Sequence, residues 1–385
     1  MMTTKKRATG LALAAASVAI GAGRAGAEPM FLSRQYARCT TCHYSPTGGG
    51  LLTPYGRSLS RQELSTTGAV PDGTPEQLKS KEEAFLWGVL GNILHPVDVG
   101  IDLRPARLDL DFGGASLGQN MLMTADLLAA YRVNGWTVYG EVGREPTLQG
   151  STQSPKIDSY EYWVGHQADK GFGFRVGRFL PAYGIRLADH TAYTRSNLGF
   201  DVYDQVYGLE LSHSSEHRLV ELSVGPGYAD SILHDDGRQA FTATGRFQMD
   251  LSPRTALVVS GLYRDTSRLV ARNGASGLAF GISPTHRLSV WTEADAQFRQ
   301  GTTGAPAYSL MNETGFEVYR GLWLKFSPQL RTDFGNTSGG SIRTAFEADL
   351  LPRTHWNVDV SYYLDHDRQT HVETKTFLAQ LHLYL

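Results

Sequence analysis

Both cysteines of the chain stand in a single short motif that is typical of covalent haem attachment. Cys39 and Cys42 are separated by two threonines, and His43 follows directly. Two thiols at this spacing can add to the two vinyl groups of one haem, and the adjacent histidine is then placed to ligate the iron. We therefore expect one haem c, with Cys39 and Cys42 as its covalent anchors and His43 as the proximal iron ligand.

Three other uses of this spacing agree less well with the sequence. A thioredoxin-like redox pair would open a helix in a βαβ unit, which the flanking residues do not indicate. A disulfide across two intervening residues would close almost no loop and would stabilise the protein little. A zinc site would need about four ligands, and no second pair of cysteines or histidines lies near the motif.

The motif leaves the sixth iron ligand open. Met30 and His190 are candidates, and His95 is the candidate distal ligand that we single out, because the chain can fold back toward the haem just before the first expected strand. A methionine in this position would raise the reduction potential relative to a second histidine.

The first 27 residues have the three parts of a secretory signal peptide. A basic region lies over 5–7, an alanine-rich apolar run follows over 11–23, and small residues form a cleavage site over 25–27. We expect cleavage after Ala27, which predicts an exported protein. Covalent attachment suits such a protein, because the cofactor cannot then be lost to the outside.

Length and composition limit the class of protein that carries this motif. The chain has 385 residues and a formal net charge of −2. A near-zero net charge argues against a nucleic-acid-binding protein, which needs a basic face. A mean hydropathy of −0.27 excludes a bundle of membrane helices. It allows a membrane β-barrel, because barrel strands are apolar on one face only.

From Val97 to the C-terminus, apolar and polar residues alternate as they do in β-strands. We expect one apolar face in each of four segments, 108–112, 121–131, 288–298 and 356–364. The last segment, 377–385, alternates to the final residue and is expected to close a barrel. One apolar and one polar face over about ten residues fits a strand with lipid on one side and water on the other.

Short turns and longer polar stretches divide this region into strands. Seven short turns are expected near 132–135, 167–171, 213–217, 251–254, 282–285, 319–321 and 351–354. Eight longer loops are expected near 113–120, 146–156, 181–202, 225–238, 265–276, 299–307, 335–341 and 366–374. Together they predict sixteen antiparallel strands, with the short turns on the periplasmic side of an outer membrane. A soluble β-sandwich would not explain this asymmetry.

These patterns predict an all-β chain in four parts. We expect a signal peptide over 1–27, a monohaem cytochrome c unit over 28–65, a linker with a short helix over 66–96, and a sixteen-stranded outer-membrane barrel over 97–385. An even number of strands brings both ends of the barrel to the periplasmic side, where the haem unit is then expected. The longest loop, 181–200, is expected either to fold into the pore and constrict it or to lie outside the barrel.

The order of these parts resembles the fused monohaem cytochrome–porins of iron-oxidising bacteria. The resemblance rests on the signal peptide, on 34–35 and the motif at 39–43, on the Pro/Gly-rich segment that ends at 55–57, and on the barrel. It implies that electrons pass from an extracellular donor, with Fe(II) as a candidate metal donor, to a periplasmic cytochrome or another electron carrier. The glycines at 48–50 and the short first loops depart from the family, which leaves the donor open.

Membrane thickness limits where the haem can act. A hydrocarbon core of about 30 Å would separate donor and acceptor if the haem stayed outside the barrel. We therefore expect residues 28–95 to insert at least partly into the lumen. Two alternative functions would use the same parts: a diffusion porin with a haem-bearing plug, or outward electron delivery to an external acceptor.

A pyridine haemochrome spectrum of the purified protein is expected to show the band of a c-type haem, because the motif supplies both thioether anchors. A spectrum without that band would contradict the cofactor prediction.

Overall fold

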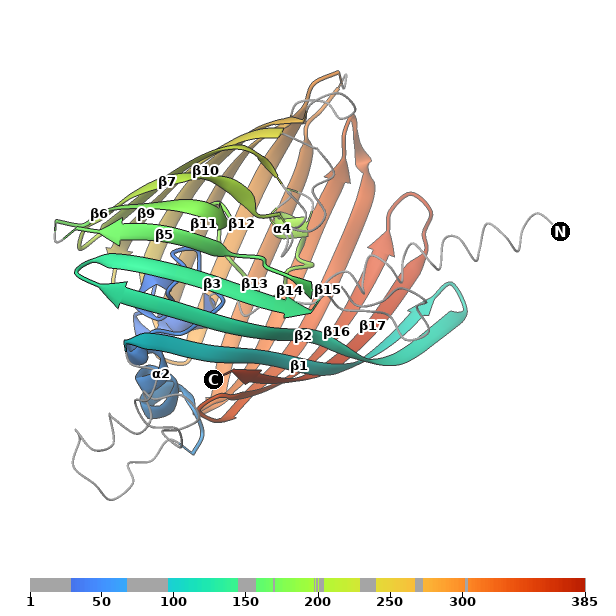
Figure 1. Cartoon of the computed structure of the whole chain (residues 1–385). Coiled ribbons are helices and arrows are strands. Elements are labelled where there is room, and N and C mark those ends of the chain that lie inside the picture. Colours follow the sequence, from blue (N-terminus) through green and yellow to red (C-terminus); the bar gives the residue numbers. More distant parts are fainter. Residues whose placement is uncertain are drawn as a thin grey trace.

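The chain folds as a closed β-barrel with an N-terminal segment in its lumen (Figure 1). The computed structural model describes residues 29–67, 96–144, 157–168, 170–196, 198, 200, 204–228, 240–266, 273–301 and 304–384. The expected signal peptide, the expected helix of the linker and the candidate ligand His95 lie outside these residues.

Nearly all regular structure in the described residues is β-strand. The short helical elements are η1 Pro29–Arg34, η2 Cys39–Thr41, α2 Pro54–Leu59, η3 Ser60–Leu64 and α4 Tyr193–Ser196. None of the helices in the described part of the chain is long and apolar enough to cross a bilayer. The strands are β1 Val97–Phe112, β2 Ala115–Val133, β3 Trp136–Arg144, β4 Ile157–Asp158, β5 Tyr162–Gln167, β6 Phe172–Phe179, β7 Val206–Ser214, β8 Arg218–Tyr228, β9 Ala240–Ser252, β10 Thr255–Thr266, β11 Asn273–Thr285, β12 Leu288–Arg299, β13 Ala307–Tyr319, β14 Leu322–Asp333, β15 Asn336–Arg353, β16 Trp356–Asp367 and β17 Glu373–Tyr384.

These strands fill sixteen positions around the barrel, as predicted. β4 and β5 both pair with β3 and therefore share one position. Every neighbouring pair is antiparallel, and β17 pairs with β1 through partners such as Phe377 and Asp109. The last strand therefore closes the barrel, which confirms the expectation from its alternating sequence.

The outer face of the barrel is apolar and the inner face is polar. On β11 and β10, Leu278 and Val259 are cross-strand neighbours that point outward, with exposed fractions of 53% and 46%. On β12, Glu293 and Asp295 point inward and are buried. A closed antiparallel barrel with an apolar outer surface is an outer-membrane barrel.

Six of the seven predicted short turns coincide with turns between consecutive strands. The seventh, predicted at 282–285, lies in the end of β11, and the turn follows it at 286–287. Two predicted long loops are wrong. β1 and β2 are joined by Gly113 and Gly114 alone, and β14 and β15 by a similarly tight turn that contains Gly335. Gly113 and Gly114 have φ values of 56° and 85°, which a two-residue hairpin turn requires. The polar residues that were expected to form loops over 113–120 and 335–341 instead lie mostly in long strands.

The predicted lipid-facing side is wrong over 108–112 and over the first residues of 121–131. Leu108, Met121 and Met123 are buried in one inward-facing cluster, whereas Leu127 is exposed. In β2, a register shift beside Pro105 inserts an extra residue, so Met121 and Met123 face inward whereas Leu127, on the other side of this bulge, faces outward as predicted. In β1 the inward face is continuous from Asp102 to Leu110, so its apolar side turns into the lumen without a bulge. The alternation expected over 288–298 and 356–364 is confirmed.

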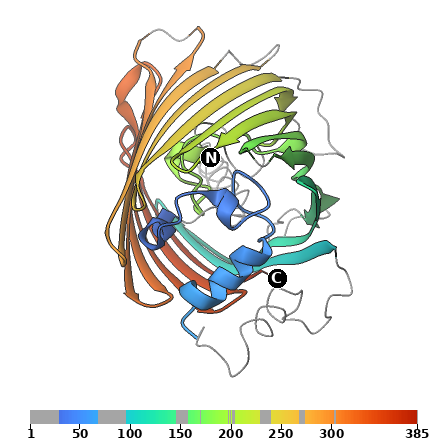
Figure 2. The same cartoon turned by 90° about the vertical axis from the view of Figure 1, so that its left-hand side faces the viewer.

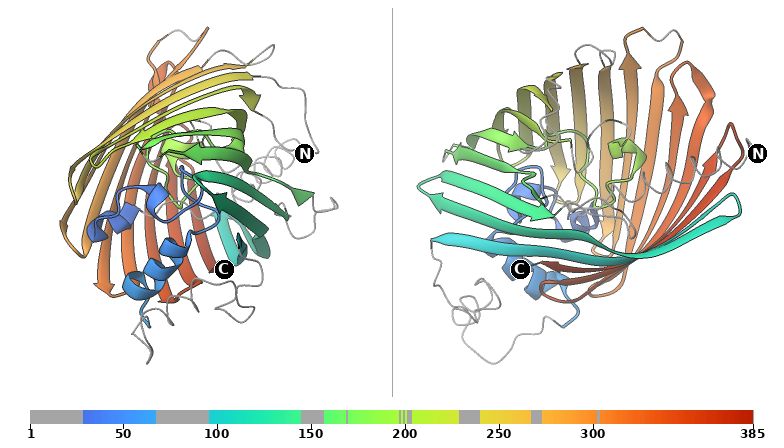
Figure 3. Two further views of the ribbon diagram at one scale, coloured as in Figure 1. Left: turned by 60° about the vertical axis from the view of Figure 1, so that its left-hand side comes forward. Right: turned by 45° about the vertical axis from the view of Figure 1, so that its right-hand side comes forward.

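Residues 29–67, which we call the plug, lie inside the barrel at the end that carries the short turns (Figures 2 and 3). Ser289 Oγ and Trp291 Nε1 on the wall both donate hydrogen bonds of 3.0 Å to the Pro29 carbonyl. At the other end of the plug, the Thr66 amide donates to the Leu351 carbonyl at 2.8 Å. The plug is therefore held against the wall at both of its ends.

Replacing Leu278 by arginine should lower the free energy of unfolding by about 2–4 kcal/mol, because it places a charge on the lipid-facing side of a central strand. Denaturant titration of the protein in lipid vesicles measures this change. The matched variant Leu278→Met keeps the volume and should lose less than about 1.5 kcal/mol. Equal losses in the two variants would show that Leu278 does not face lipid.

Candidate functional site

The C-x-x-C-H motif forms a compact turn at the centre of the plug. The amides of Cys42 and His43 both donate to the Cys39 carbonyl, at 3.1 and 3.0 Å. The Thr53 amide donates to the Cys42 carbonyl at 2.8 Å, and the Thr53 hydroxyl caps α2 by accepting from Gly56 at 3.1 Å. The motif and the helix that follows it therefore hold one another in place.

A backbone carbonyl fixes the orientation of the His43 ring. Its Nδ1 lies 3.0 Å from the Gly49 carbonyl, so Nδ1 carries the proton and Nε2 keeps its lone pair. Gly48, Gly49 and Gly50 all have positive φ, between 60° and 82°, and this conformation carries the Gly49 carbonyl back to the ring. Burial, with Arg186 as a smaller cause, lowers the pKa of His43 to about 4.

The two thiols are separate in this structure, and burial favours their protonated form. Cys39 and Cys42 are half-buried and are not joined by a disulfide. Burial raises the pKa of both thiols, that of Cys42 to about 12. Such thiols are poor nucleophiles at neutral pH, which does not favour a thioredoxin-like redox role.

Both cysteines and His43 line one cavity of about 870 Å³ that continues along the lumen. This volume is that of the lumenal space as a whole, which extends from the motif to Asp367 and Thr370. Met30 and His190, the other two candidates for the distal ligand, line the same cavity. The donor set, two neighbouring thiols and an oriented imidazole that all border the lumenal cavity, fits a c-type haem.

The long segment between β6 and β7 folds into the lumen and does not extend outward. The Tyr183 hydroxyl donates to Asp295 at 2.9 Å, and the Gly184 amide donates to Ser260 Oγ at the same distance. Arg186 donates to the Thr47 hydroxyl at 3.0 Å, so the segment also contacts the plug. Of the two expectations for this loop, the structure therefore supports a constriction of the pore.

The structure shows ion pairs between the plug and the barrel wall that the sequence did not predict. Arg38, directly before the motif, donates to Asp250 on β9 at 2.6 and 2.9 Å and to Ser214 at 3.0 Å. Arg34, which the resemblance singled out, pairs with Glu317 on β13. An inward-facing acid on a strand is the only sequence signal for such a partner, and it does not identify which plug residue it meets.

The fold is that of the outer-membrane porins, although no protein-family model matches the chain and no curated protein matches its sequence. Similar solved structures include Pseudomonas putida OprB, with a TM-score of 0.58 and 6% identity, which covers 75% of this chain and 94% of its own. The anion-selective porin from Comamonas acidovorans has a TM-score of 0.55 and 10% identity, over 75% of this chain and 99% of its own. OmpT of Vibrio cholerae has a TM-score of 0.54 and 12% identity, over 75% and 97%. These likenesses establish the barrel fold.

Lowering the pH from about 6.5 to about 4 should weaken plug docking in the haem-free protein. Because the pKa of His43 is lowered on folding, the undocked chain binds more protons in this window, so stability falls as pH falls, by on the order of 3 kcal/mol from this residue. Protease cleavage within 29–67 reports the undocked fraction. His43→Gln removes this titration and should show a shallower pH dependence; an unchanged profile would contradict the assignment.

Proposed function

We propose that the chain is a porin-type outer-membrane barrel whose lumenal plug carries one c-type haem on Cys39 and Cys42, with His43 as the proximal ligand. The observation that carries this proposal is the position of the C-x-x-C-H motif. Its thiols and the oriented His43 ring open on a cavity inside the barrel. When bound, such a haem supplies one-electron exchange at its iron.

Electron transfer is the function that the motif favours. The plug and the inserted loop occupy the lumen and contact one another through Arg186 and Thr47. The barrel wall then insulates the cofactor site from lipid, and the cavity gives access along the lumen. The direction we favour is from an external donor to a periplasmic carrier that docks at the short-turn end, with outward delivery as the reverse of the same path.

Solute diffusion past the plug is the second candidate, and the comparisons favour it. The similar structures are porins, and one of them is described as anion-selective. The cavity runs from the motif to residues at the opposite end, including Asp367 and Thr370. In this alternative the haem-bearing plug is a gate on the periplasmic side.

Proteoliposomes that contain an entrapped redox dye separate these functions. With an impermeant external reductant, the wild type should reduce the dye, whereas the Cys39→Ala, Cys42→Ala variant, which lacks the thioether anchors, should not. Swelling of the same vesicles in small sugars measures diffusion, and Arg38→Ala should increase it if the plug closes the pore. Swelling without haem-dependent dye reduction in the wild type would refute the electron-transfer function and support the porin.

A further inference from the structure

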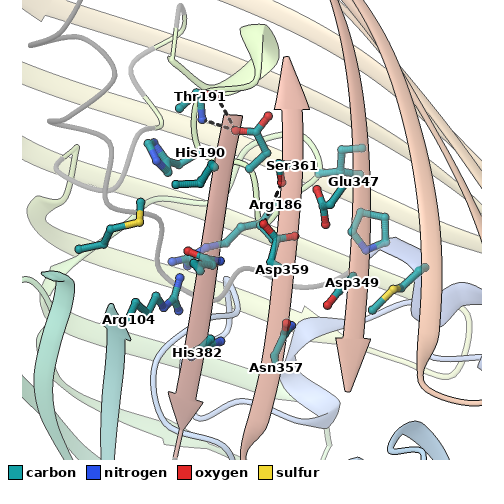
Figure 4. A pocket seen from close by; sticks show the side chains of 18 of the residues that line it. Arg104, Arg186, His190, Thr191, Glu347, Asp349, Asn357, Asp359, Ser361 and His382 are labelled. Carbon is teal, nitrogen blue, oxygen red and sulfur yellow. Dashed lines mark hydrogen bonds between the residues drawn. The ribbon is translucent and has the colours of Figure 1, made fainter. Parts of the chain in front are cut away.

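Carboxylates gather on the lumenal face of β15 and β16, away from the C-x-x-C-H motif in sequence. Glu347, Asp349 and Asp359 point into the same part of the lumen (Figure 4). Asp349 and Asp359 are direct cross-strand partners. Like charges at directly opposed positions destabilise a sheet unless a cation lies between them.

One ammonium group, that of Lys325, forms ion pairs with this cluster. Lys325, the cross-strand partner of Glu347 on β14, lies with its Nζ 2.6 Å from Glu347 Oε1 and 3.0 Å from Asp349 Oδ2. Asp359 accepts a hydrogen bond of 2.8 Å from the Ser361 hydroxyl, which carries no charge. Three carboxylates that share a single ammonium leave an excess of negative charge.

Two arginines that line the same cavity, Arg104 and Arg343, neutralise other acids. Arg104 pairs with Asp102 at 2.8 Å, and Arg343 pairs with Asp365 at 2.8 Å. The charge on the β15–β16 face is therefore not balanced by these cations. Burying uncompensated carboxylates is costly, and a bound counterion removes that cost.

Two buried oxygen atoms, one within the cluster and one on the neighbouring Asn357, point to a ligand. Asp349 has an exposed fraction of 1%, and its Oδ1 has no hydrogen-bond partner among the described residues. Asn357 lies on β16 two residues before Asp359, and its Oδ1 is likewise buried without a described partner. Buried oxygens of this kind require a partner, and amide and carboxylate oxygens are the ligands that hard divalent cations prefer.

We propose that Glu347, Asp349, Asn357 and Asp359, the lumenal carboxylate site, bind one hydrated divalent cation of the hard, oxygen-preferring class. Within the described residues, no three or more His, Cys, Asp or Glu side chains are arranged to coordinate a metal directly. The bound ion therefore keeps much of its water shell, as Mg²⁺ does when it binds through one or two carboxylates. This site does not depend on the haem, although it lines the same cavity.

Mn²⁺ binding to the full-length protein, followed by the loss of the free-ion signal in electron paramagnetic resonance, tests the site. Asp349→Asn combined with Asp359→Asn should weaken binding at least about tenfold. Asp111→Asn removes a carboxylate from the outer side of β1 and should leave binding unchanged. Mg²⁺ and Ca²⁺ should displace the bound Mn²⁺.

Lys325→Gln gives a change of the opposite sign, because it removes the ammonium that competes with the ion. This variant should bind Mn²⁺ more tightly than the wild type, a result that a purely structural role for the carboxylates would not produce. Circular dichroism on each variant checks that the barrel has formed. Equal Mn²⁺ binding by the wild type and the double aspartate variant would overturn the proposal, whatever the haem content of the protein.

Discussion

Backbone hydrogen bonding within a bilayer is the constraint on which the rest of this structure depends. Lipid offers no partner to an N–H or C=O group, so each strand must be paired along both of its sides. β1 meets this requirement by pairing with β2 on one side and β17 on the other. Closure also fixes which face of each strand turns inward, and it brings many charged side chains into a narrow lumen where they need partners of their own.

The plug and the inserted loop supply many of those partners. Arg38 supplies a positive charge to Asp250 on β9, which also accepts a hydrogen bond from Gln248, and Arg34 does the same for Glu317 on β13. The loop adds neutral donors, such as the Tyr183 hydroxyl on Asp295. The plug residues that hold the motif in the lumen are thus the same residues that pair with charged groups on the barrel wall. The position of the motif therefore follows from the chemistry of the barrel interior.

Local and repeated patterns were predictable from the sequence, whereas features set by distant partners were not. The strand number followed from turns such as Asn134–Gly135, whose positive φ values the residue types favour. The face of Met121 and Met123 on β2 was wrong because the bulge beside Pro105 depends on register with another strand. The polarity of residues 113–120 also led to a wrong prediction of a long loop. Two glycines form a tight turn there, and the polar residues that follow belong to a strand.

The motif itself was identified from the sequence, but its supporting contacts were not. Cys39, Cys42 and His43 are recognised by spacing alone, whereas Arg38 and Asp250 are 212 positions apart and meet only through the fold. Asp349 and Asp359 similarly become neighbours through the pairing of β15 with β16. A sequence pattern indicates that each of these acids faces inward, but the register decides what it faces.

The glycines at 48–50 have a geometric role beside the His43 ring. Burial selects the charge state of His43, since it lowers the pKa of the ring to about 4 and keeps the imidazole neutral at higher pH. The Gly49 carbonyl selects the tautomer, since it accepts the proton from Nδ1 and leaves Nε2 as the basic nitrogen. Neither contribution replaces the other, because a buried ring without the carbonyl could carry its proton on either nitrogen. Three consecutive residues with positive φ make that carbonyl available, and glycine is the residue that adopts this conformation without strain.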